Sequence, residues 1–285
     1  MNAVPLDAPM LWALGAAVAY GASDFIGGVT SRVEKVWAVA ATGQAAATAA
    51  TLPFVVATWT VTPAADVGWA VLAGIGAGAG NVLIYHGLAT GRVMTVAPLA
   101  AVASTTLPVM TDIIGGRQLS HTLAAGVAVA LAAGWLVSGG GARANGRSDR
   151  KVVAIGLLAG AGFGTQFAAL GQIPAGSGLA PLGISQLASV VLIIAIARAC
   201  RVHPVPRRGR TALAAISAGL FAGIATLLFQ VSAQAGSLTV AVVLTSLYPA
   251  VTVTLGAALL RERATGVQTI GLALAAASIL LVRLG

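Results

Sequence analysis

Long apolar runs follow one another along the chain, and short segments with charges and turn residues separate them. Each run has about 20 residues or slightly more, which as a helix crosses the roughly 30 Å hydrocarbon core of a bilayer. A transmembrane barrel would need segments of about ten residues that alternate between apolar and polar positions. The pattern therefore predicts an all-α membrane protein with ten transmembrane helices, at residues 10–31, 36–57, 67–89, 92–115, 119–140, 151–173, 178–199, 211–234, 236–260 and 264–284.

The composition indicates that lipid is the solvent for most of the surface. Hydrophobic residues make up 58% of the 285 positions and charged residues only 8%, whereas a soluble domain carries about 25% charged residues. The net charge of +9 does not point to nucleic acid, because the basic residues lie in the short segments between apolar runs, where they act as topology signals. We therefore expect the lipid bilayer as a partner, and no nucleic acid.

The two halves of the chain resemble each other. A polar stretch at 139–151 lies near the midpoint, and a shift of 145 residues lays 74–137 over 219–282 without a gap. We therefore expect a first repeat at 1–140, a basic loop at 141–150 and a second repeat at 151–285. Because each repeat holds five helices, an odd number, the second repeat enters the membrane inverted. Inverted repeats build many secondary transporters, which bind substrate where the repeats meet.

Lysine and arginine set the predicted orientation. Of the 16 such residues, all but Arg117 and Arg283 lie in the segments that follow the first, third, fifth, seventh and ninth helices, together with the midpoint loop. This bias predicts that those segments are cytoplasmic and that both termini are non-cytoplasmic. We expect a multi-pass protein of the inner (plasma) membrane.

Three stretches have a familiar order: YGASDFIGG in the first helix, GLATGRVMTVAPLAAVASTTLPVM across the third and fourth, and SLTVAVVLTSLYPAVTVTLGAALLRERATGVQTIGLALAAASILLV in the last two. Together they resemble the EamA-type transporters of the drug/metabolite transporter superfamily. The resemblance implies two five-helix repeats and transport of a small molecule. Two features depart from it: Arg117 stands where Glu262 of the LxER turn stands in the second repeat, and many relatives keep their termini inside.

Asp24 is the sharpest candidate for a role in transport. It lies in the first helix about two turns from Arg32, where a carboxylate that faced lipid would cost several kcal/mol, so we expect it to face the interior. Its neighbours Tyr20, Gly21 and Gly27 are polar or small, as an interior face requires. A carboxylate there could take up a coupling proton or cation. Alternatively, it is a structural group that bonds a nearby hydroxyl or reaches the interface beside Arg32.

The helices at 67–89 and 211–234 carry matching stripes of small and polar residues. Steps of three and four put each set on one helical face. The sets are Gly74, Gly78, Asn81 and Tyr85 in the first, and Gly219, Gly223, Thr226, Gln230 and Gln234 in the second. They predict close packing at one end and a cavity lining at the other, although such residues also hold membrane helices together without any substrate. His86 is adjacent to the stripe and either titrates near neutral pH or packs as a hydrogen-bonded side chain.

Three glutamines add to the candidate lining. Gln44 and Gln186 form a repeat pair at a spacing of 142 residues. Each amide needs partners in a dry environment, so the pair either binds substrate or bonds across helices. Gln166 directly follows Thr165, which matches Asp24 in the second repeat.

Two helices contain a proline that follows hydroxyl side chains. Ser246 and Tyr248 precede Pro249, and Thr95 precedes Pro98. Proline frees a carbonyl one turn earlier and weakens the helix there. Each site is therefore either a gating bend with a polar surface or a static kink.

Enzyme motifs are missing from the sequence. It contains no GxxxxGK[ST] loop, no HExxH, no Cys/His cluster and no paired acidic motif for a diphosphate and its metal. We therefore expect no enzyme activity, no cofactor and no metal site.

The sequence as a whole predicts a secondary transporter that moves a small polar metabolite, such as an amino acid or a sugar, by alternating access. The alternatives are an uncoupled facilitator or exchanger, and a non-transporting membrane scaffold or sensor. Because only 5% of residues are aromatic, a cage for large flat cations is not expected. The sequence leaves open whether two copies form a homodimer.

Overall fold

The computed structural model describes residues 7–89, 93–116, 120–137, 147–207, 209–259 and 265–284, and only the backbone of 93–95, 98 and 147–149. The first half folds into α1 (Ala8–Thr30), α2 (Val36–Ala57), α3 (Ala64–Ala89), α4 (Val93–Ile114) and α5 (His121–Val137). The second half contains α6 (Arg147–Gly171), the short 3₁₀ turn η1 (Ala175–Ser177), α7 (Ala180–Ala199), α8 (Gly209–Ala235), α9 (Leu238–Thr245), α10 (Tyr248–Leu259) and α11 (Gly266–Leu284).

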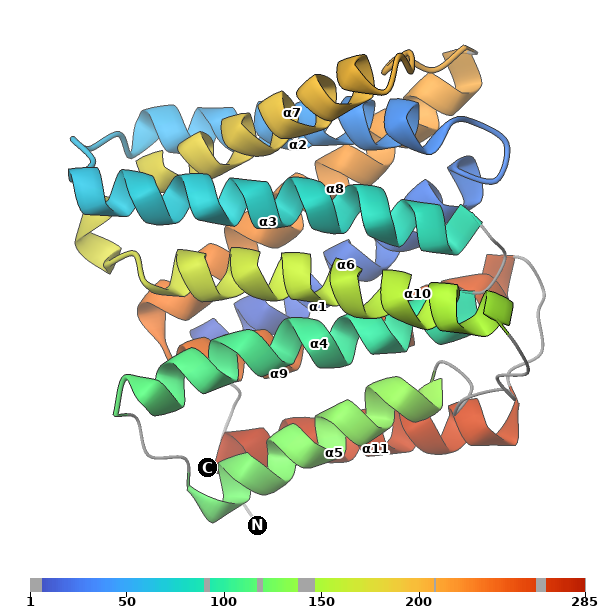
Figure 1. Ribbon diagram of the computed structural model, residues 1–285. Coiled ribbons are helices and arrows are strands. Elements are labelled where there is room, and N and C mark those ends of the chain that lie inside the picture. Colours follow the sequence, from blue (N-terminus) through green and yellow to red (C-terminus); the bar gives the residue numbers. More distant parts are fainter. Residues whose placement is uncertain are drawn as a thin grey trace.

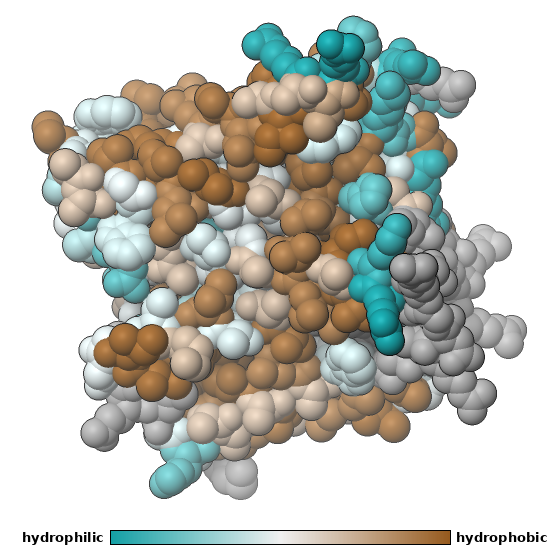
Figure 2. Space-filling view, viewed as in Figure 1, coloured by the Kyte–Doolittle hydropathy of each residue, from teal (hydrophilic) through white to brown (hydrophobic). Residues whose placement is uncertain are grey.

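Length and hydropathy make this bundle a membrane protein. Eight spans in the described residues are long and apolar enough to cross a bilayer, with α9 and α10 counted together as Leu238–Leu259, and shorter apolar helices lie at Leu99–Ile114 and His121–Val137. Large apolar side chains stay exposed on the outside, among them Leu158 and Leu213. Figure 2 shows apolar surface across the middle of the bundle and most hydrophilic surface toward the ends of the helices. The predicted all-α, multi-pass membrane fold is confirmed.

The helix bounds differ from the sequence prediction at two places. The predicted helix at 236–260 divides at Ser246 and Leu247 into α9 and α10. Pro249 has no N–H for the carbonyl one turn before it, and tighter turns replace the helical pattern, with Leu247 N–H donating to Leu244 and Ala250 N–H to Leu247. In addition, α6 begins at Arg147, so the end of the predicted loop at 141–150 is helical.

Some predicted features lie outside the described residues. These are Arg117, the loop at 141–146, and the LxER turn at 260–263. The side chains of Thr95 and Pro98 also lie outside what the structure describes.

Helices from the two halves interleave in two packing units. The first unit consists of α3, α4, α6 and α7, in which α6 packs on α3 and α4, and α7 packs on α3. The second consists of α1, α2, α8, α9 and α10, in which α8 packs on α1 and α2, and α1 packs on α9 and α10. Helix α5 packs on α11 at one side of the bundle, and α2 and α7 lie at the opposite side (Figure 1).

Glycines create the closest helix contacts, and these contacts come in matched pairs. A Cβ on Gly74 would overlap the carbonyl oxygen of Ser185, and a Cβ on Gly219 would overlap the carbonyl oxygen of Gly43. The shift of 145 residues relates the two glycines, and the shift of 142 relates their partners. In the same way, Gly126 meets the backbone of Val282 while Gly271 meets that of Val137. The small ends of the predicted stripes thus pack closely, as expected.

We expect Gly219→Ala to destabilise the bundle by about 1–3 kcal/mol, because the added methyl group forces α8 away from α2. Thermal unfolding of the purified protein in detergent measures the effect. Gly68→Ala is the matched control: Gly68 lies in α3 with nothing within 4 Å of an added Cβ, so alanine should leave stability unchanged or raise it slightly. Equal unfolding temperatures for the two variants would contradict the close contact.

Candidate functional site

A cavity lined by polar, aromatic and small side chains lies in the middle of the bundle, between the two packing units. Its volume is about 30 Å³, room for roughly two water molecules. Side chains from both packing units line it: Tyr20, Ser23, Asp24, Gln44, Ala47, Ala77, Asn81, Ser104, Phe163, Gln166, Phe167, Gln186, Ala222, Thr226 and Tyr248. Neither α5 nor α11 contributes a lining residue.

Asp24 enters this cavity from α1. The helix begins at Asp7, whose carboxylate caps it by accepting the N–H of Met10 at 3.0 Å. Asp24 is half-buried and, among the described residues, makes no hydrogen bond or ion pair. One structural alternative required a bond to a nearby hydroxyl, and the described residues do not provide one; the other, a carboxylate that reaches the interface beside Arg32, stays an alternative. The carboxylate is therefore free to take a ligand.

All three tyrosines of the chain surround Asp24. The hydroxyls of Tyr20, Tyr85 and Tyr248 lie close enough for the charge of Asp24 to act on each of them. Glycines of α1 make this approach possible. A Cβ on Gly27 would lie 2.5 Å from the Tyr85 ring, and one on Gly21 would lie 2.7 Å from the carbonyl oxygen of Tyr248.

A chain of amides crosses the cavity between the packing units. Asn81 of α3 donates from Nδ2 to Oε1 of Gln44 at 2.8 Å, and Gln44 of α2 donates from Nε2 to Oε1 of Gln186 in α7. The Nε2 of Gln186 is buried and has no hydrogen-bond partner. The chain of amides thus ends in a free donor at the cavity wall.

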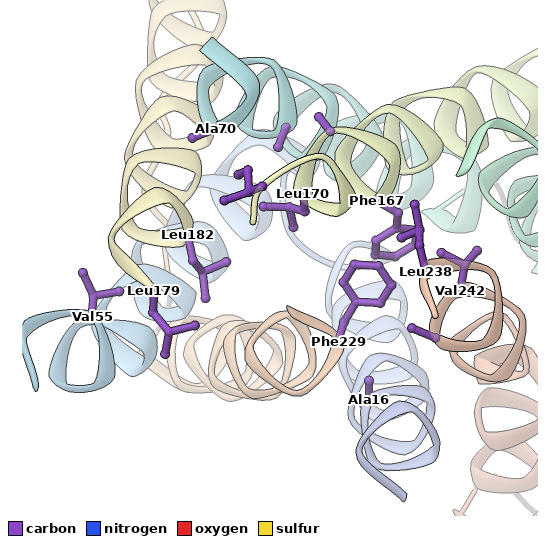
Figure 3. Close-up of a cluster of buried hydrophobic side chains, with 14 residues drawn as sticks. Ala16, Val55, Ala70, Phe167, Leu170, Leu179, Leu182, Phe229, Leu238 and Val242 are labelled. Atoms are coloured by element: carbon purple, nitrogen blue, oxygen red, sulfur yellow. The ribbon is translucent and has the colours of Figure 1, made fainter. Parts of the chain in front are cut away.

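Aromatic rings form another part of the lining. The Tyr20 hydroxyl lies 2.8 Å from Oγ1 of Thr226, and its ring meets the edge of Phe167 with centroids 6.0 Å apart. Phe167 in turn packs on Phe229 with centroids 4.5 Å apart (Figure 3). Phe163, one helical turn before Phe167, also lines the cavity.

Apolar clusters close the bundle on both sides of the cavity. The outer cluster, defined by Val55, Leu170, Leu182, Phe229 and Leu238, lies toward the loops that join α2 to α3 and α6 to α7 (Figure 3). The inner cluster, defined by Val39, Ile84, Leu88, Val152 and Ile193, lies toward the loops that join α1 to α2 and α7 to α8. The cavity thus lies between two layers of close-packed apolar side chains.

Polar contacts tie loops together at both ends of the bundle. At the end of the inner cluster, Glu34 accepts from the backbone N–H of Arg207 at 2.9 Å and from Oγ1 of Thr211 at 3.1 Å. The N–H groups of Arg207 and Lys35 hold the pKa of Glu34 below its ordinary value. At the other end, Ser177 donates to Asp66.

Most of the predicted site residues meet in the cavity. Eight of them line it together: Tyr20, Asp24, Gln44, Asn81, Gln166, Gln186, Thr226 and Tyr248. Tyr85 lies beside Asp24 without lining the cavity.

Four predicted residues lie away from the cavity. His86 is exposed, because one residue further along α3 the side chain points away from the face of Tyr85. Gln230 and Gln234 lie one and two turns beyond Thr226; Gln230 is buried with its Oε1 unpartnered, and Gln234 donates to the carbonyl of Gly178 at 3.4 Å. Ser246 donates to the carbonyl of Val243 at 2.8 Å within the turn that ends α9.

Sequence reasoning did not identify seven lining residues: Ser23, Ala47, Ala77, Ser104, Phe163, Phe167 and Ala222. Ala77 and Ala222 are related by the shift of 145 residues and lie on the two stripes, so the repeat contained a signal for them. The spacing of four between Phe163 and Phe167 was a second signal, because it puts both rings on one face of α6.

One family model matches a segment in the second half of the chain. Residues 183–284, in the second half, match the EamA-like transporter family. The match covers 102 of the 285 residues and agrees with the resemblance to EamA-type transporters found in the sequence.

The overall fold is shared with a solved structure. A crystal structure of a protein with 16% sequence identity superposes with a TM-score of 0.79, over 97% of this chain and 96% of the other. At that identity, the likeness concerns the fold alone. No curated protein matches the chain in sequence.

We expect Gln44→Leu to destabilise the protein by about 1–3 kcal/mol, because it leaves Asn81 and Gln186 without their partner in a dry environment. Gln230→Leu is the matched control. Gln230 makes no hydrogen bond with the described residues and its Oε1 is enclosed, so leucine should be neutral or stabilising there. Thermal unfolding in detergent measures both variants, and a larger loss at Gln230 than at Gln44 would contradict the amide chain.

Proposed function

We propose that this EamA-type protein is a secondary transporter that moves a small polar metabolite across the inner membrane by alternating access. The observation that carries the proposal is the cavity between the packing units, in which Asp24 has no partner among the described residues. Enclosed cavities of membrane bundles with an ionisable side chain are typical of substrate or ion pathways. The small-molecule substrate and the lipid bilayer are the partners that this function requires.

The proposal includes two inverted five-helix repeats, at 1–140 and 151–285, joined by the segment at 141–150. The matched glycine contacts support it: Gly74 with Ser185 and Gly219 with Gly43 exchange under the repeat shifts. The pairing of helices supports it too, because α3 on α7 has its counterpart in α8 on α2. An inverted pair of repeats offers two equivalent packings, each open to one side.

Alternating access requires each end to open while the other stays closed. The outer and inner clusters are the two closures, and each consists of apolar side chains from both packing units. The break between α9 and α10 lies beside the cavity, since Tyr248 begins α10 and lines it. A helix without a continuous hydrogen-bond ladder bends there at lower cost.

We further propose that Asp24 carries the coupling proton or cation. In liposomes that contain the purified protein and an internal pH dye, we expect substrate addition to drive proton movement, with pools of small metabolites screened first. Asp24→Asn should abolish this coupled signal without loss of folded protein, because an amide cannot exchange a proton at neutral pH.

The control for this experiment is Asp7→Asn, the same substitution on the same helix. Asparagine is as good an N-cap as aspartate, so coupled transport should persist. Unchanged proton movement in Asp24→Asn removes Asp24 from the mechanism. Substrate flux without proton movement in the unsubstituted protein identifies an uncoupled facilitator or exchanger, and no flux for any pool favours a scaffold or sensor.

The proposed orientation has both termini outside the cytoplasm, and the native cysteine tests it. Cys200 is exposed in the basic segment after α7. We expect a membrane-impermeant maleimide to leave Cys200 unlabelled in intact cells and to label it after permeabilisation. In a Cys200→Ser background, Gly176→Cys should be labelled from outside, because Gly176 is exposed in η1 at the other end of the bundle. The reverse labelling pattern would show that both termini lie in the cytoplasm.

That two copies form a homodimer stays a prediction.

A further inference from the structure

We infer that the cavity binds a small organic monocation, with its charged nitrogen at Asp24 and a hydrogen-bond acceptor at the free N–H of Gln186. The inference rests on the proposed transport function and names the class of its substrate. It follows from three properties of the described lining: its charge, its rings and the unpartnered donor of Gln186.

The charge of the lining favours a cation. Asp24 is the one charged side chain among the lining residues that the structure describes, and no Lys, Arg or His accompanies it there. A carboxylate without a partner in a low-dielectric interior costs several kcal/mol, and a bound cation recovers that cost. An anion would meet Asp24 as a like charge. A zwitterion would bring a carboxylate for which the described lining offers no cation.

The rings around Asp24 complement the same charge. Tyr20, Tyr248, Phe163 and Phe167 all line the cavity. Aromatic faces attract ammonium groups electrostatically, and more strongly in the absence of water. The tyrosine hydroxyl oxygens add acceptors for the N–H groups of an ammonium.

The Gln186 amide specifies the other end of the ligand. Gln186 is 4% exposed, and its Oε1 already accepts from Gln44. Gln186 lines the cavity, and its buried Nε2 has no partner in the described residues. A buried donor without an acceptor costs about 1–3 kcal/mol. A carbonyl or hydroxyl oxygen on the ligand satisfies this donor, and the bonds from Asn81 through Gln44 fix its orientation.

The cavity volume limits the size of the ligand. The cavity has room for roughly two waters, about 30 Å³, so we infer a small ligand that displaces this water and moves the lining side chains apart. The site therefore selects small amines with an oxygen acceptor, rather than cations in general.

Four small probes separate these requirements by isothermal titration calorimetry on the purified protein in detergent. L-alaninamide carries the cation and a carbonyl acceptor, L-alanine is its zwitterion, L-lactamide is its neutral analogue, and sec-butylamine is a cation without an acceptor. We expect L-alaninamide to bind most tightly. Asp24→Asn should weaken its binding at least about tenfold, and Gln186→Leu should weaken it by about tenfold while leaving sec-butylamine unchanged.

Asp7→Asn is again the control and should bind L-alaninamide as the unsubstituted protein does; thermal unfolding of each variant verifies that it is folded. The inference is overturned if L-alaninamide does not bind, if L-alanine or L-lactamide binds as tightly, or if Asp24→Asn binds it unchanged. Flux in the liposome assay is measured separately with metabolite pools of every charge. Flux of a neutral or anionic metabolite would therefore uphold the transporter while overturning this substrate class.

Discussion

The need to place a carboxylate in the middle of an apolar bundle constrains much of this structure. Asp24 has no partner among the described residues, so its cost must be limited by what lies around it. The three tyrosine hydroxyls and the cavity itself provide that surrounding. Gly21 and Gly27 then become necessary, because a Cβ at either position would collide with the elements that carry Tyr248 and Tyr85.

Features that depend on spacing along a helix could be predicted from the sequence. The apolar runs gave the helices, since only a helix satisfies every backbone group within a single segment in lipid. The stripes of α3 and α8 gave the close approach at Gly74 and Gly219. The contact of Gln44 with Gln186 was predicted as one of two alternatives, because an amide buried in a membrane bundle needs either a ligand or another amide.

Features that depend on depth and on neighbouring helices could not be predicted in this way. The stripe of polar residues predicts which face of α8 is interior, but it does not predict where along the helix the cavity ends. For this reason Gln230 and Gln234 were predicted to line the cavity, although they lie beyond its end. The low aromatic content of the whole chain gives no sign of Phe163 and Phe167 in the site, because their meeting with Tyr20 and Tyr248 in one cavity depends on how the helices pack. The division between α9 and α10 was open, because Pro53 interrupts α2 in sequence without dividing it.

The packing units have a consequence for how the cavity can open. Each unit draws helices from both halves of the sequence, so the tightest glycine contacts lie within units: Gly74 on Ser185 in the first, Gly219 on Gly43 in the second. In the proposed alternating access, we therefore expect the units to separate rather than the sequence halves, since parting α2 from α8 would break close backbone contacts. The amide chain is one of the polar bridges between the units, because Gln44 belongs to one and Asn81 and Gln186 to the other. In this proposal, a ligand that bonds Gln186 would act on this bridge, so binding and opening would depend on the same side chains.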